Sequence, residues 1–204
     1  MGDHAVRQQS AELSPSPNGW TETTLHSFGA VNDGSSAFGG VVFDSHGNLY
    51  GTTFNGGTGG GTVYQLQPSG SGWSYRVLLS LLGSEGPTAT PTLDSAGNLF
   101  ASTDADGSSF GNTFELSPGN NGWTYSDLHD FDGSDGSCPF GVLALDSSGN
   151  LYGTTFQGAE GGVAFEITPW GENLAILPCL YLPEIPPASV QILATSSLPS
   201  TSKH

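Results

Sequence analysis

The 204 residues include 31 glycines and 13 prolines, and 3 Lys and Arg side chains against 19 Asp and Glu side chains give a formal net charge of −16. Nucleic acids and anionic membranes need basic side chains that neutralise phosphates, so this charge balance argues against both as partners. No apolar run approaches the length of a membrane span, and no secretory signal is visible in the first residues, so we expect no membrane insertion.

In chain order, the sequence divides into a short tail, a repeat domain and a second tail. Residues 1–11 carry no repeat pattern, whereas residues 12–169 contain three similar units of about 50 residues. The bounds of these units are about 12–64, 65–114 and 115–165. Residues 170–204 are rich in Pro and Ser, and we predict an irregular C-terminal tail there.

Each unit predicts four short strands. One starts at a tryptophan after a Pro/Gly/Asn turn, one leads into the turn Asp-Ser-x-Gly-Asn, and two follow that turn, as in "NLYGTT" and "GTVYQL". In these runs apolar and small polar residues alternate, and aromatic and β-branched residues dominate. We therefore predict an all-β fold, a β-propeller-like tandem repeat of about three four-stranded blades. Because propellers typically close with about four to eight blades, we expect an open or incomplete one.

Residues that recur at the same phase in all units are most simply structural, because three copies of a catalytic residue would be redundant. The aspartates of the turn are interpreted as turn formers. The tryptophans are interpreted as packing anchors, with a sugar-stacking platform as the functional alternative. The predicted structural residues are Asp44, Gly47, Asn48, Tyr50, Asp94, Gly97, Asn98, Phe100, Asp146, Gly149, Asn150, Tyr152, Trp20, Trp73 and Trp123.

The histidines and cysteines predict no catalytic or metal site. His26 and His129 share one phase, and Leu79 occupies it in the middle unit, which indicates packing rather than proton transfer. Cys138 and Cys179 are far apart and match no metal-binding spacing. The spacing does not favour a disulfide between them, and it leaves their pairing open.

The acidic residues that do not recur are the better candidates for chemistry. Asp130, Asp132 and Asp135 cluster beside glycines in "DFDGSDG", which is the type of segment that a calcium ion requires. A solvated acidic turn is the alternative, because the segment matches an EF-hand loop poorly. Apart from this calcium hypothesis, we expect no cofactor.

The segments "GNLYGTT", "GGGTVYQLQP", "GWSYRVLLSL" and "NDG" together resemble the tandem repeats of bacterial choice-of-anchor GloVer-containing proteins. The resemblance covers roughly residues 12–169 and implies an exported or surface-attached repeat protein of propeller type. The middle unit departs from it, since Phe100, Ala101 and Ser102 replace Tyr, Gly and Thr. After residue 169 the pattern stops, so we expect a truncated member of the family.

Three functions from different classes fit these observations. The first is a non-enzymatic module of the extracellular space or cell surface that binds glycan or protein, or acts as a spacer. The second is a carbohydrate-active or calcium-dependent propeller enzyme, which needs non-repeating carboxylates to converge. The third is a degenerate fragment without independent function, which predicts exposed sheet edges and self-association through them.

Overall fold

The computed structural model describes residues 9–70, 72–83, 86–104, 110–158, 161–169 and 174–177. Every regular element in these ranges is a β-strand, as the sequence predicts. All pairs of neighbouring strands are antiparallel. The described part of the chain has no helix that is long and apolar enough to cross a membrane.

Three sheets of similar construction follow one another along the chain. The first has the order β4 (Val42–Phe43), β5 (Leu49–Thr53), β7 (Thr62–Ser69) and β8 (Gly72–Ser80). The second has the order β9 (Thr92–Leu93), β10 (Leu99–Thr103), β11 (Asn112–Gly119) and β12 (Gly122–Asp130). The third has the order β14 (Ala144–Leu145), β15 (Leu151–Gln157), β16 (Ala164–Ile167) and β17 (Leu174–Leu177).

Three short strands and one late strand extend this scheme. In the third sheet β13 (Ser137–Pro139) also pairs with β15. A separate two-stranded sheet joins β3 (Gly34–Ser35) to β6 (Asn55–Gly56). Strand β17 lies within the range 170–204 that the sequence assigned to the tail, and it pairs with β16 as the fourth strand of its sheet.

The chain starts with a hairpin that repeats the last two strands of a sheet. Its strands are β1 (Gln9–Ser16) and β2 (Gly19–Ser27). Pro15 pairs with Trp20 at its tip, as the equivalent Pro and Trp residues pair in β7–β8 and β11–β12. All three hairpins carry a bulge at the same register position, between residues 10 and 11, 63 and 64, and 113 and 114. We call β1–β2 the N-terminal hairpin.

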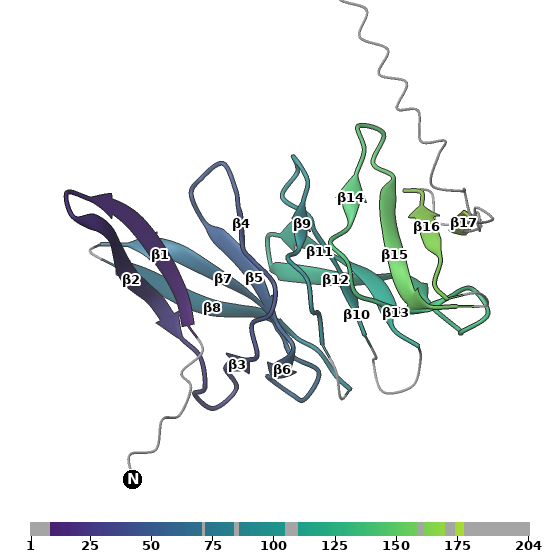
Figure 1. Cartoon of the computed structure of the whole chain (residues 1–204), viewed down its shortest axis with the longest axis horizontal. Coiled ribbons are helices and arrows are strands. Elements are labelled where there is room, and N and C mark those ends of the chain that lie inside the picture. Colours follow the sequence, from purple (N-terminus) through teal and green to yellow (C-terminus); the bar gives the residue numbers. More distant parts are fainter. Residues whose placement is uncertain are drawn as a thin grey trace, which may run out of the picture.

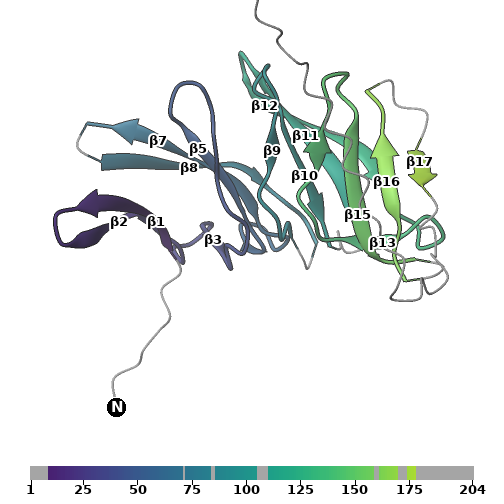
Figure 2. The ribbon, with the colours of Figure 1, turned by 45° about the horizontal axis from the view of Figure 1, so that its top comes forward.

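The N-terminal hairpin and the three sheets form a row in chain order, from left to right in Figure 1. Figure 2 shows the same order after a 45° turn. The hairpin and the third sheet lie at opposite ends of this row, which does not close on itself. The architecture is therefore an open and incomplete propeller-like arrangement.

Apolar clusters fill the spaces between consecutive members of the row. Each sheet places one aromatic ring of its third strand against the preceding member, and these rings are 1% exposed at Tyr64, Phe114 and Phe165. The opposite face contributes to the next cluster, where Tyr50 and Phe100 are covered by the following sheet. Both faces of the inner sheets are thus buried, so each depends on its two neighbours for stability.

The tryptophans predicted as packing anchors differ in their surroundings. Trp73 and Trp123 are half-buried and pack against the clusters of the first and second spaces of the row. Trp20 is 69% exposed, because no described element covers its face of the N-terminal hairpin. Cys138 lies in β13, while Cys179 is outside the described residues, so their pairing stays open.

Candidate functional site

The Asp-Ser-x-Gly-Asn turn has one geometry in all three sheets. In the first sheet Oδ1 of Asp44 accepts bonds from the amides of His46 (2.8 Å) and Asn48 (2.9 Å), and Oδ2 accepts one from Nδ2 of Asn48 (2.7 Å). Asp94 and Asp146 accept equivalent bonds in their own turns. The glycine of each turn has a φ of 81°, 91° or 88°, a conformation that glycine adopts without strain.

These hydrogen bonds lower the pKa of two of the turn aspartates. Burial alone would raise the pKa of Asp44, but the bonds from Asn48, the His46 amide and Tyr50 outweigh it and lower the pKa. At Asp146 the bond from the backbone amide of the turn asparagine is the main cause of the lowered pKa. Both carboxylates therefore stay ionised at neutral pH and are poor proton donors.

An aromatic ring follows each turn. The hydroxyl of Tyr50 donates to Oδ2 of Asp44 at 3.0 Å, and that of Tyr152 donates to Oδ2 of Asp146 at 3.2 Å. The second sheet carries Phe100 at this position. Burial, followed by the bond to Asp44, raises the pKa of Tyr50, so its hydroxyl remains a donor at neutral pH. Because the hydroxyl is held toward the turn, the ring presents its apolar part to the following sheet.

A cleft of about 750 Å³, the first cleft, lies between the first and second sheets. Asp44, His46 and Tyr50 line it from the first sheet, and Asp94 and Trp123 line it from the second. The centroids of the Tyr50 and Trp123 rings are 5.9 Å apart, and the rings meet edge to face at 67°. The first cleft therefore combines aromatic surface with ionised and hydrogen-bonding groups, as ligand-binding pockets commonly do.

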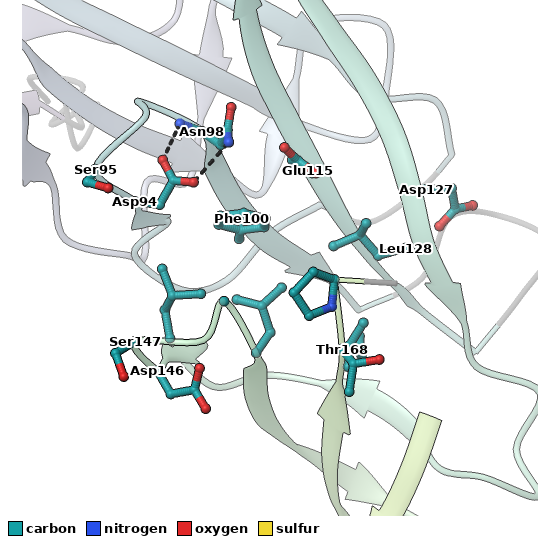
Figure 3. A pocket seen from close by; sticks show the side chains of 15 residues that line it. Asp94, Ser95, Asn98, Phe100, Glu115, Asp127, Leu128, Asp146, Ser147 and Thr168 are labelled. Carbon is teal, nitrogen blue, oxygen red and sulfur yellow. Dashed lines mark hydrogen bonds between the residues drawn. The ribbon is translucent and has the colours of Figure 1, made fainter. Parts of the chain in front are cut away.

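A cleft of about 500 Å³, the second cleft, lies between the second and third sheets. Figure 3 shows Phe100 facing this cavity, between the turns of Asp94 and Asp146. Glu115 and Asp127 enter from the strands β11 and β12, with Asp127 at the far rim. Four carboxylates thus line the second cleft beside an apolar floor.

The two clefts are neighbours that share one turn. Asp94 and Ser95 line both of them, because the second turn lies between the other two. Neither Lys nor Arg is among the residues that line either cleft in the described part of the chain. An anionic ligand would therefore meet carboxylates without a compensating Lys or Arg side chain.

The structure adds two His–Asp pairs that the sequence interpretation did not include. Nε2 of His26 lies 3.0 Å from Oδ2 of Asp33, and Nε2 of His129 lies 2.7 Å from Oδ2 of Asp135. Both rings also pack edge to face on a neighbouring Phe, in accordance with the predicted packing role. The sequence contains a signal for these pairs, because histidine and aspartate change together. Leu79 replaces the histidine in the one unit that has Glu85 in place of the paired aspartate.

In the acidic segment predicted as a calcium site, the carboxylates of Asp132 and Asp135 accept hydrogen bonds from groups of the same segment. Oδ1 of Asp132 accepts bonds from the amide and hydroxyl of Ser134, and these bonds lower its pKa. Oδ1 of Asp135 accepts a bond from the amide of Asp132. Asp130 is an exposed residue at the end of β12. Within the ranges that the structure describes, no three His, Cys, Asp or Glu side chains are grouped so that they could hold a metal ion.

Comparison with known protein families agrees with the repeated architecture. The family model described as the Gloeobacter/Verrucomicrobia repeat matches residues 10–180, which is most of the chain. The chain belongs to this family. The match to the Gloeobacter/Verrucomicrobia repeat includes the N-terminal hairpin from its second residue onward and β17, as well as the three turns. No curated protein is similar enough to count as a match.

Membership of the Gloeobacter/Verrucomicrobia repeat family shows that the chain is a repeat module. It also confirms the resemblance to GloVer repeats that the sequence indicates. The description of the family names no ligand or reaction.

Proposed function

We propose that this chain is a non-enzymatic binding module that holds a neutral or cationic glycan in the clefts between its sheets. The observation that carries the proposal is the first cleft, where the half-exposed Trp123 lies beside Tyr50 and the turn aspartates Asp44 and Asp94. The apolar face of a sugar ring packs well on an aromatic ring, and carboxylates and amides accept and donate bonds with its hydroxyls.

The charge of the clefts supports this choice of ligand. Their lining is acidic and lacks Lys and Arg among the described residues, which disfavours sulfated or uronic acid glycans. The turn aspartates are held by bonds from their own turns, so they are positioned before a ligand arrives. Such fixed groups reduce the entropy that is lost on binding.

Isothermal titration calorimetry on the full chain tests the proposal. The ligands are a neutral cello-oligosaccharide, a cationic chitosan oligomer and an anionic oligogalacturonate at equal chain length. We expect binding of the neutral or the cationic oligomer and none of the anionic one. Trp123→Ala should weaken binding by about tenfold or more, since a lost stacking contact removes a large part of the buried area.

The matched control is Trp20→Ala, which removes the equivalent tryptophan from the N-terminal hairpin, outside both clefts. It should leave the affinity of the first cleft for glycan unchanged. Preferred binding of the anionic oligomer, or equal loss of affinity in both variants, would contradict the proposed site. Failure of all three oligomers to bind would reject glycan binding in favour of a protein ligand or a spacer role.

The second cleft favours a second candidate, a carbohydrate-active enzyme. Asp94, Glu115, Asp127 and Asp146 all line it, and two suitably spaced carboxylates can cleave a glycosidic bond. Chromatography of the same oligosaccharides after incubation with the chain distinguishes this candidate from simple binding. Shortened products that disappear in Glu115→Gln would establish the enzyme and replace the proposal of a binding module.

We also propose an extracellular or cell-surface location, which rests on the GloVer resemblance of the repeats. Antibody labelling of intact and permeabilised cells of the source organism tests it. Labelling of intact cells is the expected result, and labelling that requires permeabilisation would reject the location.

A further inference from the structure

One face of the N-terminal hairpin exposes two large apolar side chains. Leu13 is 63% exposed and Trp20 is 69% exposed. The register equivalent of Leu13 in the first sheet, Leu66, is 0% exposed, and the equivalents of Trp20 pack against the preceding member of the row. The hairpin therefore presents the kind of surface that the complete sheets bury.

The third sheet presents the complementary surface at the other end of the row. Tyr152 is half-buried, whereas its equivalents Tyr50 and Phe100 are buried under the following sheet. The hydroxyl of Tyr152 lies 3.0 Å from Oε1 of Glu166 and 3.2 Å from Oδ2 of Asp146, so its single proton is shared between the two carboxylates. Tyr152 thus contacts its turn aspartate as Tyr50 does in the first sheet, where the ring of Tyr50 meets Trp123.

We propose that these two end faces bind each other between two copies of the chain. Tyr152 of one copy then packs against Trp20 of the next copy, as Tyr50 packs against Trp123 within one chain. Inside the chain, an apolar contact of the same kind occurs between each pair of consecutive members of the row. The association between copies therefore repeats an interface that the chain already contains. Because the two faces differ, the contact is head to tail and produces dimers, rings or filaments.

Charge sets the conditions under which the copies associate. The hairpin carries Glu12 and Glu22, the third sheet carries Asp146 and Glu166, and the whole chain has a net charge of −16. Repulsion between copies opposes the apolar contact, and salt screens that repulsion. Association should therefore strengthen as salt rises, whereas a partner held by opposite charge would be released.

Sedimentation velocity of residues 1–204 over a range of concentrations, at about 0.05 M and about 0.5 M NaCl, measures this association. We expect dimers or larger species that grow with concentration and with salt. Trp20→Ala and Tyr152→Ala should each abolish association. An equimolar mixture of the two should form a dimer that grows no further, because each variant keeps one intact face.

Phe38→Ala is the control, since Phe38 is 65% exposed but lies on neither end face, and it should associate like the unmodified chain. If Tyr152→Ala does not fold, Trp20→Glu at an exposed position carries the test alone. An unmodified chain that stays monomeric at every concentration and salt would overturn the proposal. Association that persists in Trp20→Glu, or that weakens as salt rises, would overturn it as well.

Discussion

Nε2 of His26 lies 3.0 Å from Oδ2 of Asp33, and this bond joins the end of β2 to the turn that leads into the first sheet. The same carboxylate accepts bonds from the amides of Gly29 and Ala30, and its other oxygen accepts one from the amide of Gly34. Asp33 is only 7% exposed, so these partners replace the water that it loses. The aspartate therefore organises the connection between two members of the row.

Asp33 should make the stability of the chain depend on pH in the acidic range. Burial alone would raise its pKa, but the polar groups around it, including Tyr75, His26 and the Gly34 amide, together lower the pKa below its ordinary value of 3.8. The folded state is therefore stabilised by ionised Asp33 above that value, and this contribution is lost as the pH falls through the lower pKa of the folded state.

Urea unfolding of the unmodified chain and of Asp33→Asn, from pH 7 downward, measures this contribution. At pH 7 the variant should be less stable by about 1–3 kcal/mol, because the charge-assisted bonds weaken. The difference between the two proteins should shrink once the pH falls below the ordinary value. A difference that stays constant over the whole range would contradict the assignment.

The turn aspartate of the second sheet should be needed for stability. Asp94→Ala removes the acceptor of bonds from the Ala96 amide (2.8 Å), the Asn98 amide (2.8 Å) and Nδ2 of Asn98 (2.9 Å). Loss of such local bonds costs about 1–2 kcal/mol, as in other side chain to backbone motifs. The exposed neighbour Ser95→Ala is the control, and thermal unfolding followed by circular dichroism compares them. Equal stability of the two variants would show that the turn forms without the carboxylate.

Tyr50→Phe should be tolerated, because the second sheet naturally has Phe100 at this position. The variant loses the bond to Asp44 and the bond that Nε2 of Gln65 donates to the Tyr50 hydroxyl, at 2.9 Å. We expect a loss of about 1–2 kcal/mol in the free energy of unfolding. Tyr50→Ala should cost about 3–5 kcal/mol, since it also leaves a cavity beside Trp123. Urea titration separates the two, and equal costs would mean that the ring does not pack between the sheets.

Gly51 should not accept a larger residue. A Cβ atom there would collide with the ring of Tyr64, which is 1% exposed and has little room to move. Gly51→Ala should destabilise the chain by about 1–3 kcal/mol, whereas Gly72→Ala, which meets no atom within 4 Å, should change stability little. Differential scanning calorimetry compares the two variants. A neutral Gly51→Ala would show that the ring of Tyr64 can shift.

The strands and turns could be predicted from the sequence because their causes are local. Alternation of apolar and polar residues defines a strand, and Asp with Gly and Asn at fixed offsets defines the turn. The clefts could not be predicted, because they depend on which sheets face each other. The contact between Tyr50 and Trp123 joins residues from different units, so the pattern of residues within one unit cannot predict it.

The exposure of the faces at the two ends of the row could not be predicted either, and the reason is physical. A strand pattern specifies which side chains share a face but not whether another sheet covers that face. Trp20 and Trp123 share the motif Asn-Gly-Trp-Thr, and yet Trp20 is exposed. Conversely, β17 lacks the tryptophan of its equivalents and still forms, since the edge of β16 offers backbone groups that can pair with it.

The His–Asp pairs reveal a longer period than the turns do. They occur in the N-terminal hairpin and at the second sheet, whereas Tyr and Gly follow the turn in the first and third sheets but are Phe100 and Ala101 in the second. Adjacent members of the row therefore differ at these positions, although their strands and turns are built alike. A sheet exchanged between two positions of the row therefore keeps its fold but meets neighbours with which its faces were not matched, because each apolar cluster combines side chains of two consecutive members.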